Sequence, residues 1–227
     1  MHFVPLYAAT TTPDQLLATN APGLLASVLG IRERPAVLER FLAAARSDLE
    51  RAWSTERRDR APELNAALAA VEQRWSGSVG PALAGYLTQN GLTGGIILPI
   101  PGLGPDGRFL AATRESPAVV AVQLPRDRAH AGDAAFFAVR ELCYPAVRRA
   151  LATPGLAPPD RVAAELLSGR AAVRCGALLL DQAGPALGGA YREAFLRASG
   201  SRDVFETAFP VSGEVLAALR ASLAIQR

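Results

Sequence analysis

Residues 116–124 read S-P-A-V-V-A-V-Q-L, and residues 134–151 read A-A-F-F-A-V-R-E-L-C-Y-P-A-V-R-R-A-L. The first stretch is rich in β-branched valine and predicts the clearest strand of the chain. The second stretch repeats apolar residues at steps of three and four and predicts a helix, with Asp133 as its N-cap. We take this strand and the helix that follows it as the centre of the fold.

Helical patterns surround this pair on both sides. Helices are expected after Pro35 and from about Pro62, and two further short strands are expected at about 93–100 and 108–113. After the central helix, helices are expected from Asp160 to about 181, over 185–199, and from Ser212 to 225. The predicted fold class is α+β, mostly helical, with a small antiparallel sheet at about residues 93–124 packed on helices. We expect one domain over residues 1–227, with a helical N-terminal part at about 13–90 and the sheet and C-terminal helices at about 91–227.

Composition excludes some classes of function. The chain has 227 residues and is 50% hydrophobic, which allows a substantial core. Its 24 basic residues are all arginine, which indicates a GC-rich coding bias, and 21 acidic residues lie among them for a formal charge of +3. We expect no nucleic-acid binding, because that function normally shows a stronger basic bias. We also expect no membrane span, and a location either in the cytoplasm or outside the cell after removal of a signal peptide.

The central helix carries one incomplete motif. Residues 140–144 read R-E-L-C-Y and follow the outline of the zinc-protease motif H-E-x-x-H. In that motif two histidines at i and i+4 bind zinc, and the glutamate acts as general base on the bound water. Here Arg140 and Tyr144 stand at the two histidine positions, while Glu141 stands at the glutamate position. Because arginine stays protonated in proteins, it cannot serve as a metal ligand there.

The order of elements around this motif resembles the zincin metalloproteases, and in particular the glutamate-ligand branch, over about residues 93–180. In that family a strand precedes the motif helix, and a glutamate on the following helix supplies the third zinc ligand. Glu165 takes that place in this sequence. The resemblance implies a zincin-like scaffold without metal or cofactor, because two of the three ligands are missing. It further implies that Arg140 points into the former metal cleft and neutralises Glu141 and Glu165.

Three functions follow from this reading. The first is a non-catalytic binding or scaffold protein, a pseudo-peptidase, with a peptide or protein in the former cleft contacting Arg140, Tyr144 and Glu165. The second is a metal-independent hydrolase that uses Glu141. The third is a purely structural helical interaction domain, which fits the alternative that this is an unrelated helical α+β fold. In that alternative Arg140, Tyr144 and Arg148 lie on a solvated stripe, with Tyr144 stacked under Arg148, and Glu165 pairs with Arg161.

Other motifs are better explained by local structure. Residues 102–107 match G-x-G-x-x-G, but a strand rather than a helix is expected after them, so we read them as a hairpin loop. Ser76-Gly77-Ser78 is read as a helix break with Ser78 as a cap, with a Ser78–His130 pair left open as an alternative. His130 is expected in a solvent-exposed loop near Asp127 and Asp133.

Two features of the central helix and its neighbour are left open. Pro145 either kinks the helix or marks the point at which it ends and restarts. Cys143 and Cys175 fall on consecutive predicted helices. They form a disulfide if the protein is exported, and are two small buried apolar side chains if it is cytoplasmic.

Overall fold

The structure is a computed structural model, and it describes residues 40, 43, 44, 47, 62–92, 94–101, 103, 107–110 and 118–224. The chain divides into two compact units, residues 1–66 and 67–227. The helix expected after Pro35 falls largely outside the described residues. Only positions 40, 43, 44 and 47 of this stretch are described, and all four are helical. Because most of the first unit is likewise outside them, the single-domain organisation stays a prediction.

One helical path runs through residues 62–89. Residues 62–74 are α-helical, Trp75–Val79 form the π-helix η1, and Gly80–Gln89 form α5. The break predicted at residues 76–78 is therefore wrong. The helix widens there instead, and the Gly80 amide donates to the Trp75 carbonyl five residues earlier. Glycine suits this turn, since a Cβ at position 80 would lie 3.0 Å from that carbonyl oxygen.

Three strands form a small sheet: β1 (Gly95–Pro101), β2 (Arg108–Leu110) and β3 (Ala118–Leu124). Their order is β1-β3-β2, with β1 parallel and β2 antiparallel to β3. The sheet is thus mixed. The prediction of an antiparallel sheet is wrong for β1 and β3, which run parallel. The hairpin predicted at residues 102–107 is also wrong, because β3 lies between β1 and β2.

The strand sequences are compatible with this order. Val120, Ala121 and Val122 are all buried, so β3 is covered on both faces, as a central strand should be. Pro99 lies in β1, at the edge of the sheet, where a residue without an amide hydrogen is tolerated.

The predicted helix at residues 134–151 consists of two helices. The 3₁₀-helix η2 (Arg128–Asp133) leads into α6 (Ala134–Leu142), and α7 (Tyr144–Leu151) follows after Cys143. Cys143 keeps right-handed helical backbone angles, so the two helices form one bent path. Pro145 explains the break, since it has no amide hydrogen to donate to the Glu141 carbonyl.

Asp133 does not cap this helix as predicted. It belongs to η2 and makes no capping hydrogen bond. Its buried carboxylate instead accepts a hydrogen bond from Arg197 Nη2 at 2.8 Å. The backbone of Asp133 is already helical, with φ −65° and ψ −20°, whereas an N-cap residue is normally extended.

The remaining helices are α8 (Arg161–Ala183), α9 (Pro185–Ser199), α10 (Phe205–Ala208) and α11 (Gly213–Ser222). Two predicted caps are confirmed. The Asp160 carboxylate accepts from the Ala163 amide at 2.8 Å, and the Ser212 hydroxyl accepts from the Val215 amide at 3.2 Å. The mostly helical α+β class is confirmed as well.

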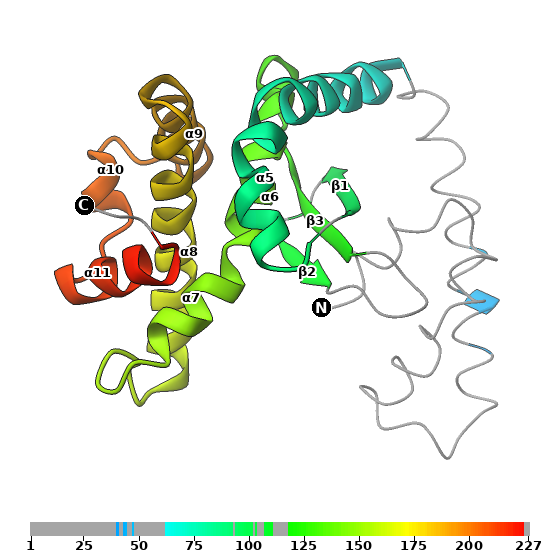
Figure 1. The fold of residues 1–227 in the computed structure, drawn as a ribbon. Helices are drawn as coiled ribbons and strands as arrows, with labels where there is room; N and C mark the ends of the chain where they lie inside the picture. The colour runs from blue at the N-terminus through cyan, green and yellow to red at the C-terminus, as the bar shows by residue number, and fades with distance from the viewer. Residues whose placement is uncertain are drawn as a thin grey trace. The chain divides into compact units, whose positions relative to one another are not determined.

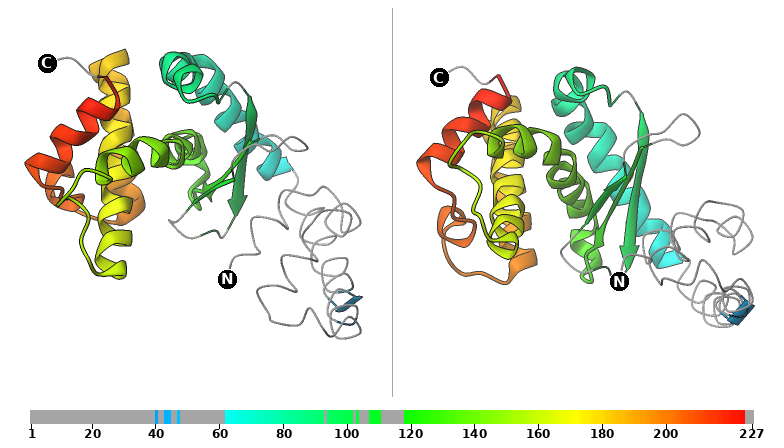
Figure 2. Two further views of the ribbon diagram at one scale, coloured as in Figure 1. Left: turned by 60° about the horizontal axis from the view of Figure 1, so that its bottom comes forward. Right: turned by 90° about the horizontal axis from the view of Figure 1, so that it is seen from below.

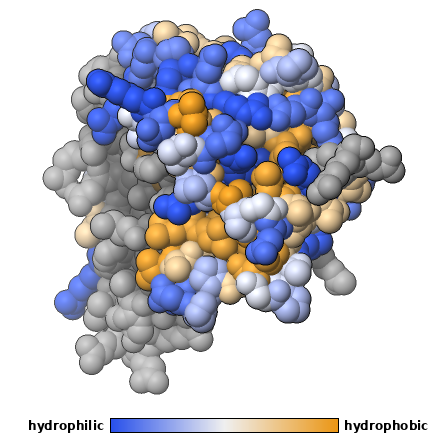
Figure 3. All heavy atoms as spheres, turned by 90° about the vertical axis from the view of Figure 1, so that its left-hand side faces the viewer, coloured by the Kyte–Doolittle hydropathy of each residue, from blue (hydrophilic) through white to orange (hydrophobic). Residues whose placement is uncertain are grey.

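The elements pack in layers beside the sheet. Figures 1 and 2 show α6 against the strands, and α8 and α9 beyond it; α11 packs on α7 and α8. Phe136 on α6 meets Tyr191 on α9 edge to face, with ring centroids 5.8 Å apart. The face that carries α9, α10 and α11 mixes hydrophilic and hydrophobic side chains (Figure 3). No helix among the described residues has the length and apolar character that a membrane crossing requires.

Candidate functional site

Three side chains of the incomplete motif lie together at the bend between α6 and α7. Arg140 Nη1 lies 3.5 Å from Glu141 Oε1, and Arg140 Nη2 donates to the Tyr144 hydroxyl at 3.2 Å. The side chains of Arg140 and Glu141 are only 11% and 3% exposed. Arg140 and Tyr144 share one face despite the break, because Cys143 keeps the helical path continuous. A guanidinium group is thus fixed inside the protein where the motif would place a metal ligand.

Two glycines allow this arrangement. A Cβ on Gly107, just before β2, would lie 2.6 Å from Glu141 Cδ, so only glycine lets the backbone approach the carboxylate this closely. A Cβ on Gly169 of α8 would lie 3.6 Å from Arg140 Nη2, which is ordinary contact. The Arg140–Glu141 pair is therefore packed between the start of β2 and the middle of α8.

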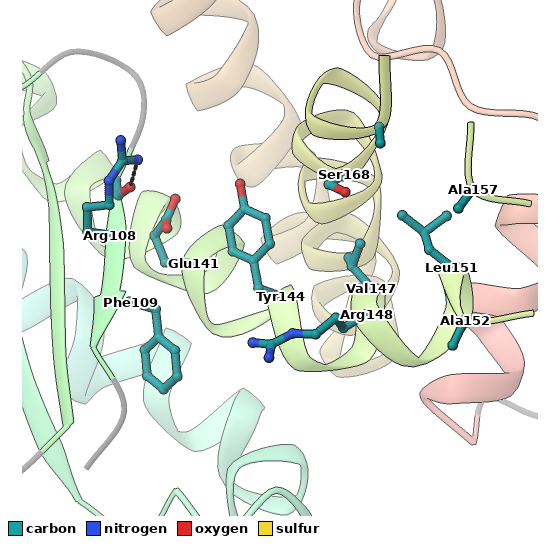
Figure 4. A pocket seen from close by; sticks show the side chains of 12 residues that line it. Arg108, Phe109, Glu141, Tyr144, Val147, Arg148, Leu151, Ala152, Ala157 and Ser168 are labelled. Carbon is teal, nitrogen blue, oxygen red and sulfur yellow. Dashed lines mark hydrogen bonds between the residues drawn. The ribbon is translucent and has the colours of Figure 1, made fainter. Parts of the chain in front are cut away.

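A hollow of about 510 Å³ opens beside these residues. In Figure 4, Arg108 and Phe109 reach it from β2, Glu141 from α6, Tyr144 and Arg148 from α7, and Ser168 from α8. It is also lined by Gly107, Val147, Leu151, Ala152, Ala157 and Ala164. Its volume is typical of a site for a small molecule or a short peptide segment.

Glu165 does not join the group predicted for it. It is absent from the lining of the hollow. Its carboxylate accepts a hydrogen bond from Arg161 Nε, one turn earlier on α8, at 3.0 Å. The two side chains are 66% and 90% exposed, so this is a surface pair. The expectation that Arg140 neutralises both acids is met only for Glu141. The alternative pairing of Glu165 with Arg161 is what the structure contains.

These contacts leave the site poorly suited to zinc. Arg140 and Tyr144 occupy two of the ligand positions that the motif would use, and Glu165 faces solvent. Within the described part of the chain, no group of three or more histidine, cysteine, aspartate or glutamate side chains is placed to hold a metal ion.

The other sequence candidates lie in ordinary structural settings. The Ser78 hydroxyl donates to the Arg74 carbonyl at 2.9 Å within its own helix, so it is not the cap that was predicted. His130 lies in η2, with Nε2 3.8 Å from Asp127 Oδ2, and both side chains are well exposed. His2 is outside the described residues.

Buried hydroxyl and thiol groups lie behind the motif. The Tyr86 hydroxyl donates to the Leu142 carbonyl at 2.8 Å, and Cys143 and Cys175 are both free and buried. Burial raises the pKa of the Cys143 thiol well above its ordinary value, and a hydrogen bond with Cys175 raises it further. Burial likewise raises the pKa of the Tyr86 and Tyr191 hydroxyls. Cys143, Tyr86 and Tyr191 are thus neutral at physiological pH.

Of the residues that line the hollow, sequence reasoning found only Glu141 and Tyr144 and missed the others, among them Gly107, Arg108 and Ser168. Gly107 carried only a turn signal, and Arg108 and Ser168 carried none. They line the same hollow as Glu141 and Tyr144 only because β2 and α8 fold beside the bend between α6 and α7.

No protein-family model, no curated protein and no solved structure matches this chain.

Proposed function

We propose that this protein is a metal-free binding domain on a zincin-like scaffold, and that the hollow beside Glu141 holds a peptide or protein segment. The observation that supports this most directly is the buried Arg140 guanidinium. It lies between the Glu141 carboxylate and the Tyr144 hydroxyl, at 3.5 Å and 3.2 Å. A fixed monovalent cation balances the carboxylate there without any metal.

The position of Glu141 also favours binding over catalysis. A general base must reach the proton that it removes, usually at 2.6 to 3.2 Å, about one hydrogen bond away. The Glu141 side chain is 3% exposed, lies against Gly107, and faces the Arg140 guanidinium. The carboxylate is therefore engaged by groups of the protein itself rather than open to a substrate proton.

A metal-independent hydrolase is the second candidate, because Glu141 does line the hollow. A screen of peptide and ester substrates against the purified protein tests it. Turnover that disappears in Glu141→Gln, and is kept in Glu165→Gln, would support this candidate over a binding domain. Glu165 is the matched control, since it is a surface glutamate outside the hollow.

The metal-free proposal is tested by metal content. We expect the purified protein to carry far less than one zinc ion per chain after dialysis against zinc-containing buffer. One tightly held zinc per chain, resistant to brief chelation, would overturn the proposal.

The scaffold is tested by restoring the motif. Arg140→His together with Tyr144→His places two imidazoles at i and i+4 beside the Glu141 carboxylate, which favours a bound cation at a buried site. The control is Arg161→His with Glu165→His, an equally spaced pair on the exposed start of α8. We expect the restored site to bind zinc at least about tenfold more tightly than the control, measured by calorimetry on folded protein. Equal affinities would remove the support for a former metal site.

A further inference from the structure

Among the residues that the structure describes, the charges around the hollow are not balanced. The described lining contains the guanidinium groups of Arg108 and Arg148 and one carboxylate, that of Glu141. Glu141 already faces Arg140 at 3.5 Å. Arg148 is exposed and makes no hydrogen bond or ion pair with any other described residue. The guanidinium of Arg108 donates to the carbonyl of its own neighbour Gly107 at 2.8 Å, and it has no acidic partner in the described parts of the chain.

This excess of positive charge favours an anionic ligand. In Figure 4, Arg108 and Arg148 approach the hollow from different elements, β2 and α7. Two guanidinium groups around a partly enclosed space attract an anion more strongly than they would on an open surface. Arginine also binds carboxylates through paired hydrogen bonds.

The wall of the hollow formed by α7 and the residues beyond it is mostly apolar, apart from Arg148. It contains Val147, Leu151 and Ala152 from α7, and Ala157 and Ala164 beyond them. The Ser168 hydroxyl lies at the rim on α8 (Figure 4), and it makes no hydrogen bond to another described residue. A ligand that fits this wall has one apolar group and at least one polar group that can bond a hydroxyl.

We propose that the hollow binds the C-terminal end of a peptide, with its terminal carboxylate at Arg148, its last side chain apolar, and a backbone amide at Ser168. This inference rests on the binding function proposed above and specifies the ligand. A peptide terminus supplies the anion, the apolar group and the amide within one residue, whereas a fatty acid supplies only the first two. Arg108 adds attraction for the carboxylate without being required to contact it.

Fluorescence anisotropy tests this proposal with a labelled pool of hexapeptides that end in leucine. The pool is made twice, once with a free C-terminal carboxylate and once with a C-terminal amide. We expect the free acid to bind at least about tenfold more tightly, since a charged hydrogen-bonded pair is lost on amidation. Arg148→Gln should weaken binding of the free acid by about the same factor and leave the amide unchanged. Arg170→Gln is the control, because Arg170 is an exposed arginine of α8 that does not line the hollow.

Three outcomes of the binding experiments would overturn the proposal of a peptide C-terminus. Equal binding of acid and amide would remove the role of the carboxylate, while leaving a binding domain in place. Binding of dodecanoate at lower concentration than the peptide acid would assign the site to fatty acids instead. Absence of binding by both peptide pools would exclude a peptide terminus. The metal-content experiment tests the metal-free part of the proposed function separately, because it does not depend on which ligand enters the hollow.

Discussion

The buried pair between Arg140 and Glu141 should contribute far more to stability than the surface pair between Arg161 and Glu165. The buried pair has the longer distance, 3.5 Å against 3.0 Å, but its side chains are 11% and 3% exposed, while those of the surface pair are 90% and 66% exposed. Burial therefore outweighs distance in this comparison.

The magnitude follows from Coulomb's law. At 3.5 Å and an effective dielectric constant of about 20, two unit charges attract by about 5 kcal/mol. Removing one partner of such a pair costs about 3 to 5 kcal/mol, because the other charge stays buried. At 3.0 Å in water the attraction is about 1.4 kcal/mol, and side-chain entropy and salt reduce it to about 0.5 kcal/mol or less.

Double-mutant cycles measured by urea unfolding test this difference. One cycle combines Arg140→Met with Glu141→Gln, and the other combines Arg161→Met with Glu165→Gln. We expect Arg140→Met alone to cost about 3 kcal/mol or more, and the double variant to recover part of that loss because the buried charge is gone. The surface cycle should show a coupling energy below about 0.5 kcal/mol. Similar coupling energies in the two cycles would refute the account of the site as a buried charge pair.

Three further predictions concern the core behind the site. Gly176→Ala should destabilise the protein by about 2 kcal/mol or more in thermal unfolding, because a Cβ there would lie 2.6 Å from Tyr191 Cζ and overpack a fully buried ring. The control is Gly189→Ala on the adjacent helix, where no atom lies within 4 Å of the added Cβ, and it should raise stability by about 0.5 to 1 kcal/mol. If Gly176→Ala stabilises the protein as much as the control does, the packing argument is wrong. Because burial raises the pKa of Cys143, Tyr86 and Tyr191, the unfolded state releases these protons first as pH rises. These groups should therefore leave the free energy of unfolding unchanged below about pH 8.5. Above that pH the free energy of unfolding should fall by up to about 1.4 kcal/mol per pH unit for each group. A urea midpoint that rises from pH 9 to 11 would contradict the expected fall. The buried Cys143 thiol should also resist iodoacetamide at neutral pH in the native protein and react in denaturant, as intact mass would show; rapid labelling without denaturant would mean that the helices around it open.

Local chemistry made much of the secondary structure predictable. Asp160 and Ser212 cap the helices that follow them, because an N-cap needs only a side-chain oxygen and an amide three residues later. Asp133 has the same local signal and fails as a cap, since the preceding 3₁₀-helix gives it a helical backbone, and its carboxylate pairs with Arg197, 64 residues away in sequence. Capping is thus predictable only where the residue also takes the extended backbone that Asp160 and Ser212 have.

The strand directions were beyond the reach of the sequence. Alternation and β-branched residues indicate that a strand exists, and they carry the same pattern in parallel and antiparallel pairs. The parallel pairing of β1 with β3, and the insertion of β3 between β1 and β2, depend on how the connections and α6 pack together.

The sequence by itself determined that Arg140, Glu141 and Tyr144 lie on neighbouring helical positions, because the geometry of one helix fixes which side chains at i and i+4 can meet. Only the tertiary structure decided which residues from other elements reach them. Glu165 has the spacing of a partner and faces solvent, while Gly107 and Ser168 have no distinctive spacing and lie at the site. The physical reason is that the relative position of two helices is set by side-chain packing along their whole contact, which no short motif encodes.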